Sequence, residues 1–233
     1  MDITQNLKLF DDGLGKNTGR HADGRSASFD YCFNHFQSFR EEDKVQKLAE
    51  AGNMEMSCLQ LGFYLASWGM LRGSSFLLEK SLRFYQPLIR GIATFDRRVW
   101  DIDADSYDDE NIAVLLDCQD MIIESFGREN NPSDTLVTKI LLGVFGNVPA
   151  FDRFFRKGFA VHSFGRKSLR VIAKFYEENR AGIDKIEICT FDYATGSPTH
   201  RKYPKAKLID MIKNIEGLNK TLPAQKEQTI QGV

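Results

Sequence analysis

The stretch that most constrains the fold is residues 133–158, where two expected helices meet at a tight corner. The first of these helices is mostly apolar and carries one lysine, Lys139. The second opens at Pro149, a residue suited to the start of a helix, and it places Asp152 in its first turn. A helix that is apolar on most sides has to be packed against other elements. The sequence therefore predicts a packed corner that holds a lysine and a carboxylate.

Most of the remaining chain has the apolar periodicity of helices, interrupted by glycine and proline. The segment 54–68 is apolar on all sides, so we expect it to be the central helix of the domain. Further helices are expected from Ser26 or Ser28 onward, over 41–51, over 88–100, from Ser106 to Gly127 and over 168–180.

The C-terminal part changes pattern. Residues 186–193 alternate and are β-branched early, which predicts a strand, and 199–203 can pair back on it. Pro204 then opens a last helix that Gly217 closes. The expected fold is mainly α, an orthogonal multi-helix bundle with a small C-terminal β-hairpin and a final helix. The expected organisation is an N-terminal loop or extension at 1–25, a single helical domain with the hairpin at 26–217, and a polar tail at 218–233.

Charge is balanced overall and uneven locally. The net charge of −1 provides no general attraction to nucleic acid or to a membrane. Residues 101–124 carry nine acids and no lysine or arginine, whereas residues 151–207 carry 13 basic residues against 6 acids. This distribution predicts a basic side built from the C-terminal half. The other interpretation is that both blocks are solvated helix faces.

Several functional classes lack their sequence signals. The four cysteines contain no C-x-x-C pair, which disfavours a zinc ribbon. No G-x-S-x-G elbow, P-loop or kinase signature is present. The acidic loop 101–112 begins like a calcium loop but lacks a glycine at its sixth position, and its twelfth position is Ile112. We therefore expect no cofactor and no metal. With no signal segment and no long uninterrupted apolar run, a cytoplasmic protein without a membrane partner is expected.

Lys139 and Asp152 are the candidate catalytic pair. Burial disfavours the charged form of a lysine and lowers its pKa, and such an amine can attack carbon and form a Schiff base. A carboxylate at the start of the next helix could orient water or stabilise a developing cation. The alternative interpretation is structural: the stem of Lys139 covers the core, and Asp152 interacts with the positive end of its own helix.

Basic residues cluster after Asp152 and around the turn that follows the segment 54–68. A turn between helices offers backbone N–H groups to phosphate, and neighbouring cations add attraction. For the arginine in the earlier turn, the alternative is a hydrogen bond to carbonyls that end the preceding helix. The candidate nucleic-acid contacts are Arg153, Arg156, Lys157, Arg166, Lys167 and Arg72.

The order L-V-T-K-I-L-L-G-V-F-G-N-V-P-A-F-D-R-F-F resembles the helix-hairpin-helix DNA glycosylase superfamily, in particular uncharacterised members with an oxoguanine-glycosylase-like fold. The segments Y-L-A-S-W-G-M-L-R-G and Y-P-K-A-K-L-I-D-M-I are similar as well. The resemblance implies that Asp152 is the shared catalytic carboxylate and Lys139 a nucleophile. Two features depart from the family pattern: residues 130–138 contain no glycine pair, and the spacing from Lys139 to Asp152 is short.

The resemblance implies a nucleic-acid-binding protein, with DNA as its partner and a role in DNA repair or in defence against foreign DNA. A flipped base would enter a pocket in the bundle, where Trp68 and Tyr64 are candidates for stacking on it; core packing is the alternative for both. A different reading is a non-catalytic helical module that binds a protein partner, such as an antitoxin or a subunit of a defence complex. The acidic block at 101–120 would then dock a basic partner.

Overall fold

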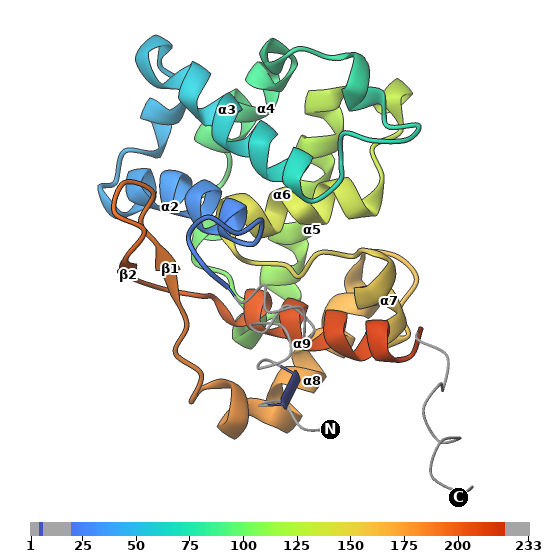
Figure 1. Ribbon diagram of the computed structural model, residues 1–233. Helices are drawn as coiled ribbons and strands as arrows, with labels where there is room; N and C mark the ends of the chain where they lie inside the picture. Colours follow the sequence, from blue (N-terminus) through green and yellow to red (C-terminus); the bar gives the residue numbers. More distant parts are fainter. Residues whose placement is uncertain (1–4, 7–19, 222–233) are drawn as a thin grey trace, which may run out of the picture.

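The computed structural model describes residues 5–6 and 20–221, and most of them are helical (Figure 1). The mainly α fold with a small C-terminal hairpin and a final helix is confirmed. Short 3-10 helices, from η2 (Val45–Ala49) to η7 (Arg128–Asn130), fill several connections. The longer helices are α2 (Ala27–Glu41), α3 (Ala51–Ser67), α4 (Gln86–Thr94), α5 (Asp109–Phe126), α6 (Asp134–Phe145), α7 (Arg153–Phe159), α8 (Arg166–Ile183) and α9 (Lys205–Asn219).

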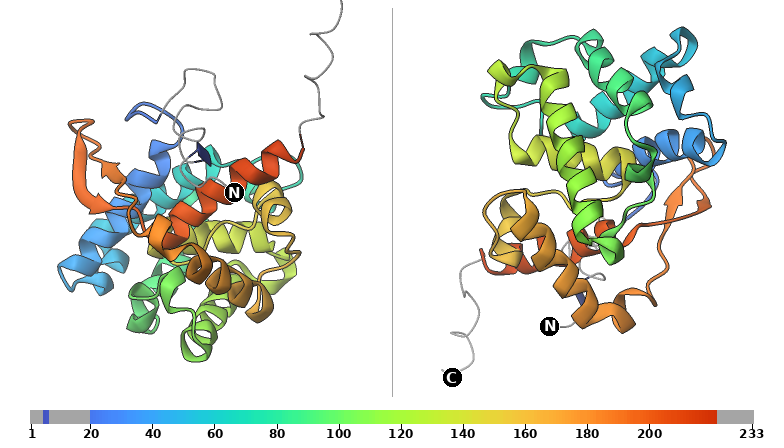
Figure 2. Two further views of the ribbon diagram at one scale, coloured as in Figure 1. Left: turned by 90° about the horizontal axis from the view of Figure 1, so that it is seen from below. Right: turned by 180° about the vertical axis from the view of Figure 1, so that it is seen from behind.

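The element at the centre of the structure is α6, whose residues from Leu136 to Phe145 are all buried. It packs against α2, α3 and α5 (Figure 1). The prediction that segment 54–68 is the central helix is wrong, because α3 buries one face and leaves apolar side chains in solvent. Phe63 is 66% exposed, and Met56 and Leu59 are exposed as well. Helices α7, α8 and α9 gather at the end of the molecule away from α3 and α4 (Figures 1 and 2).

The predicted corner consists of α6, a buried connection and α7. Ser133 caps α6 as expected, since its hydroxyl accepts a hydrogen bond from the backbone N–H of Leu136. Gly146 ends α6 with a φ of +73°, in the left-handed region that favours glycine. The second helix begins at Arg153 rather than at Pro149, so Asp152 is its N-cap residue. The buried connection is tied to neighbouring segments through Asn147, whose side-chain amide donates to the carbonyl of Val99 at 2.9 Å and whose backbone carbonyl accepts from the hydroxyl of Tyr107.

Two other expected helices differ from the structure. The segment 41–51 is the end of α2 followed by η2, and Gly52 lies inside α3 rather than ending a helix. The expected helix over 88–100 stops at Thr94 and resumes as the short η5 (Arg97–Trp100). The reason is local: Asp96 accepts a hydrogen bond from the backbone N–H of Arg98 and so caps a new turn.

The hairpin pairs β1 (Cys189–Phe191) with β2 (Pro198–Lys202) in antiparallel fashion; β1 lies within the predicted strand 186–193, and β2 begins one residue before the predicted strand 199–203. Arg20 joins this hairpin to the N-terminal segment and to α2. Its guanidinium bonds the carboxylate of Asp30 at 2.7 Å, the hydroxyl of Tyr203 at 2.8 Å and the carbonyl of Cys189. Asp30 is wholly buried, so this cluster fixes where residues 20–25 run. The expected end of the last helix at Gly217 is wrong, since α9 continues to Asn219. Residues 1–4 and 7–19 of the expected N-terminal extension, and residues 222–233 of the expected tail, lie outside the described residues.

Helices α7 and α9 are in direct backbone contact. A Cβ atom added at Gly217 would lie 1.8 Å from the carbonyl oxygen of Phe154, and one added at Gly158 would lie 2.2 Å from that of Lys213. Only glycine at both positions allows this approach. The contact places the first turn of α7, at Phe154, against the last turn of α9, at Gly217. Within the described part of the chain, no helix combines the length and apolarity needed to cross a bilayer.

Replacing Gly217 with alanine should destabilise the protein by about 3 kcal/mol, because the new methyl group forces two backbones apart in a packed region. The control is Gly52→Ala, at an exposed helical glycine whose added Cβ meets nothing within 4 Å. That change should leave stability equal or raise it by up to ~1 kcal/mol. Urea unfolding of both variants measures the difference, and equal stabilities would contradict the close contact of α7 and α9.

His35 should make stability pH-dependent. Burial lowers its pKa from 6.5 to about 4, and its Nε2 lies 3.0 Å from the hydroxyl of Ser57. Between these two pH values the unfolded chain binds a proton that the folded chain does not, so stability falls as pH drops from 6.5 toward 4. The loss approaches ~3 kcal/mol.

The measurement is unfolding at several pH values for wild type and for His35→Gln, whose curve should lack this component. The difference between the two proteins isolates His35, because Asp103, whose pKa burial raises to about 6, titrates in the same window in both. His200→Gln is the control, since the side chain of His200 is 82% exposed. An unchanged curve in His35→Gln would show that the imidazole is solvated in the folded protein.

Candidate functional site

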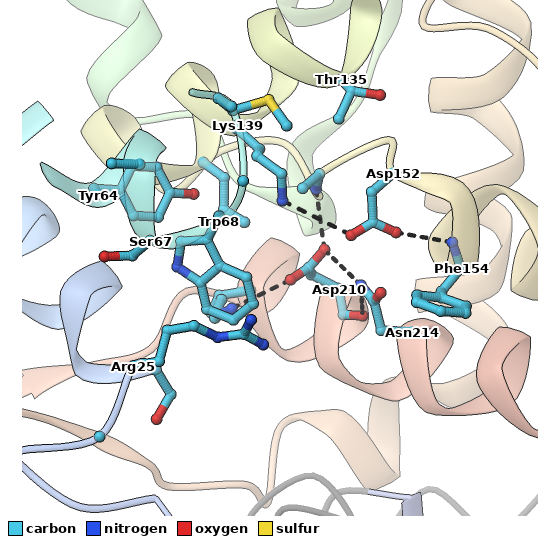
Figure 3. Close-up of a pocket in the computed structure, with 18 of the residues that line it drawn as sticks. Arg25, Tyr64, Ser67, Trp68, Thr135, Lys139, Asp152, Phe154, Asp210 and Asn214 are labelled. Atoms are coloured by element: carbon cyan, nitrogen blue, oxygen red, sulfur yellow. Dashed lines mark hydrogen bonds and ion pairs between the residues drawn. The ribbon is translucent and has the colours of Figure 1, made fainter. Parts of the chain in front are cut away.

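A cavity of about 1100 Å³ lies where four parts of the chain meet. Residues 20–26 form one wall, and the end of α3 with the turn after it forms another. The remaining walls come from α6 and from the facing ends of α7 and α9. Lys139, Asp152, Trp68 and Tyr64 all line it, so the structure brings together the predicted catalytic and base-pocket residues (Figure 3).

Lys139 projects from the buried helix α6 into this cavity and is 4% exposed. Its Nζ lies 3.7 Å from Oδ2 of Asp152. Burial lowers the pKa of Lys139, while the charge of Asp152 opposes that shift. The surroundings thus favour the neutral amine more than water does, and the amine lies beside a carboxylate that can take its proton.

Asp152 uses its two carboxylate oxygens differently. Oδ1 accepts hydrogen bonds from the backbone N–H groups of Phe154 at 2.9 Å and Phe155 at 3.0 Å, which caps α7. Oδ2 faces Lys139. The side chain is 26% exposed, so it is oriented by its helix and still open to the cavity. Both predicted roles of Asp152, the structural one and the one facing a site, are therefore compatible in a single conformation.

A second lysine–carboxylate pair, which sequence reasoning missed, forms the floor of the cavity. Asp210 accepts hydrogen bonds from the backbone N–H of Ala150 at 3.1 Å, from the amide of Asn214 at 3.2 Å and from Nζ of Lys207 at 3.2 Å. Burial raises the pKa of Asp210, and the charge of Asp152 raises it further. The available signal was a lysine and an aspartate three residues apart in the otherwise apolar run A-K-L-I-D-M-I.

Trp68 stands between the two pairs at the end of α3 (Figure 3). Lys139 Nζ lies 5.3 Å from the centroid of its indole ring, Lys207 Nζ lies 5.4 Å away, and the guanidinium of Arg25 lies 5.0 Å away. An electron-rich ring face attracts such cations. Tyr64 is 2% exposed and its ring packs where Gly143 has no side chain. Tyr64 is therefore a wall of the cavity, whereas Trp68 offers part of its ring to the cavity's contents.

The predicted basic cluster is divided by ion pairs. Arg156 lies 3.7 Å from Asp134, and Arg166 lies 3.3 Å from Asp109 of the acidic block. The acidic and basic blocks thus meet at two places, where Arg166 and Arg170 pair with Asp109 and where Lys205 pairs with Asp105. Among the six predicted nucleic-acid contacts, Arg72 and Arg153 line the cavity; the other four do not, and these are Arg156, Lys157, Arg166 and Lys167.

The cavity has the chemistry of a nucleophilic site. It contains a buried amine of lowered pKa, a carboxylate within reach of that amine, and an aromatic face beside the amine. Across residues 5–6 and 20–221, no group of three or more His, Cys, Asp or Glu side chains gathers as metal ligands.

The capping role of Asp152 can be separated from its charge. Asp152→Ser keeps an N-cap oxygen and Asp152→Ala does not, while both lose the carboxylate. The alanine variant should therefore be less stable than the serine variant by about 1 kcal/mol. In both, the pKa of Lys139 should fall further, since the charge that raised it is gone. Equal free energies of unfolding in urea would show that α7 does not depend on this cap.

Comparisons with known proteins add no relative: no family model, no curated protein and no solved structure matches the chain. The resemblance to the glycosylase superfamily stays a prediction. Support for any function comes from the residues of the cavity.

Proposed function

We propose that this protein binds nucleic acid and acts on one nucleotide turned into the cavity, as a DNA glycosylase with lyase chemistry. The observation that supports this most directly is the 3.7 Å approach of Lys139 Nζ to Asp152 Oδ2 in the wall of a cavity of about 1100 Å³. Ligand cavities of roughly 300–1000 Å³ are usual for small molecules, so a nucleoside fits in this one.

In the proposed reaction the neutral amine of Lys139 attacks C1′ of the sugar. The bond from C1′ to the base breaks, and the base leaves with the bonding electrons and takes up a proton. The nitrogen, now bonded to C1′, gives its extra proton to Asp152. The bond from C1′ to the ring oxygen then breaks, the ring oxygen is protonated, and an imine joins Lys139 to the opened sugar.

Asp152 is suited to the positive charge that such a reaction develops on the sugar. Its Oδ1 is fixed by two backbone N–H groups, so Oδ2 cannot swing away from Lys139 at little cost. A preoriented carboxylate stabilises a developing cation without reorganisation during the reaction. The partial exposure of Asp152 supports contact with a bound sugar.

Trp68 supplies the face on which the departing base would stack, and buried Tyr64 supports the wall behind it. Base removal followed by strand cleavage serves either DNA repair or the destruction of foreign DNA, the two roles that the family resemblance implies. The same cavity chemistry would serve both.

One feature favours the alternative of a protein-binding module. Met56, Leu59 and Phe63 are exposed at helical spacing along α3 and form an uncharged stripe. An exposed apolar stripe of this kind can receive a protein partner. This role predicts no oligonucleotide binding and no covalent intermediate, so the experiment below separates the two.

Borohydride reduction should trap the protein on an oligonucleotide that contains an abasic site. An abasic site has a free aldehyde at C1′ and no base, so the test does not require the target base to be known. Lys139→Gln should abolish the trapped adduct, and Asp152→Asn should slow its formation about a hundredfold, as expected for loss of a general base. Trapping should also reach its plateau at a lower pH than a surface lysine allows, because the pKa of Lys139 is lowered.

The control is Lys185→Gln, which removes an exposed lysine outside the cavity. It should trap like wild type. If wild type forms no adduct, the enzymatic proposal fails. An adduct that persists in Lys139→Gln would assign the chemistry to another amine.

A further inference from the structure

Charge is distributed differently inside the cavity and at its rim. Inside, each buried lysine has a carboxylate: Lys139 lies beside Asp152, and Lys207 beside Asp210. The rim carries three exposed arginines that line the same cavity and form no ion pair with any described residue. These rim arginines are Arg25, Arg72 and Arg153.

Such arginines are uncommon in this protein. Ten of the fifteen arginines in the described part of the chain pair with a carboxylate. Three of the other five are the rim arginines, so more than half of the described arginines without an ion pair lie at this opening. Asp23 also lines the cavity, but it forms no ion pair with them.

The rim arginines are positioned in ways that leave their hydrogen-bond donors available. The guanidinium of Arg25 lies over the ring of Trp68, and that of Arg153 lies 4.6 Å from the ring centroid of Phe154. A guanidinium stacked on a ring keeps its N–H groups at its edge for an oxyanion. Arg72 lies against Gly69, in the turn where φ is +79°, and a side chain at position 69 would displace it.

From this arrangement we infer that Arg25, Arg72 and Arg153 form a phosphate clamp for a single nucleic-acid strand, with one phosphate on each side of the inserted nucleotide. A ligand that matches these charges carries anionic groups at the rim and an uncharged group within the cavity. A phosphodiester chain with one nucleoside turned into the cavity has this distribution. The three arginines come from the N-terminal segment, the turn after α3 and the start of α7. Spread over three elements, they suit several phosphates better than one. The nucleoside part rests on the proposed function.

The test measures binding of a single-stranded oligonucleotide carrying a reduced abasic analogue that cannot form an imine. Affinity is followed by fluorescence anisotropy across salt concentrations for Arg25→Gln, Arg72→Gln, Arg153→Gln and the triple variant. Each single change should weaken binding roughly tenfold at low salt and reduce the slope of log affinity against log salt by about 0.7. The matched control is Arg83→Gln, an exposed arginine without an ion pair to described residues and outside the cavity.

Arg83→Gln should keep the wild-type slope. The clamp is overturned if the triple variant binds with unchanged affinity and slope, or if wild type does not bind the strand. It is also overturned if thymidine 5′-monophosphate or inorganic phosphate binds as tightly as the strand, since a single-phosphate site would explain that result. If binding depends on the rim arginines but borohydride traps no adduct, the clamp is supported and the proposed reaction fails. If the triple variant is trapped like wild type, the proposed reaction is supported and the clamp fails.

Discussion

The backbone contact between α7 and α9 is the constraint on which the site depends. Helix α7 has seven residues, too few to be stable alone in water. It is held by Asp152 at its N-terminus and by α9 along its length, where Gly158 and Gly217 let the backbones meet. Because α7 is fixed against α9, its capping carboxylate lies beside Asp210 and opposite Lys139. A larger residue at either glycine would move the acid away from the amine.

Burial of Lys139, Lys207 and Asp210 beside the partly exposed Asp152 explains why the cavity residues are so closely paired. An isolated lysine or carboxylate is costly to remove from water. Here two lysines and two carboxylates share the cost, and Asp210 also bonds the backbone N–H of Ala150. This hydrogen bond anchors the connection between α6 and α7 to α9. The charges thus contribute to the geometry of the corner, and the two carboxylates oppose the lowering of the pKa of Lys139 that burial causes.

A feature could be predicted from the sequence when it depends on residues that are close together along the chain. The Ser133 cap, the hairpin and the meeting of Lys139 with Asp152 depend on short spacings along the chain, and they were predicted. The apolar run around Lys207 and Asp210 could have indicated a buried pair, but the hydrogen bond from Ala150 to Asp210 spans 60 residues and no local pattern reveals it. The apolar composition of α3 did not show which face is buried. The pairing of Arg166 with Asp109 joins residues 57 apart, so spacing along the chain does not predict it, and the nucleic-acid role of the basic cluster stays a prediction.

The cavity belongs to the whole chain rather than to the corner that supplies its lysine. Arg20 is tied to Asp30, to Tyr203 just before α9 and to the hairpin carbonyl of Cys189. That junction directs the next five residues along the cavity, and it is why Arg25 reaches Trp68. Without the junction, Lys139 and Asp152 would keep their contact, because it depends on α6, α7 and α9. The cavity would lose a wall and one rim charge. The junction therefore positions residues that would contact a ligand, and the α7–α9 contact positions Asp152 beside Lys139 for the proposed reaction.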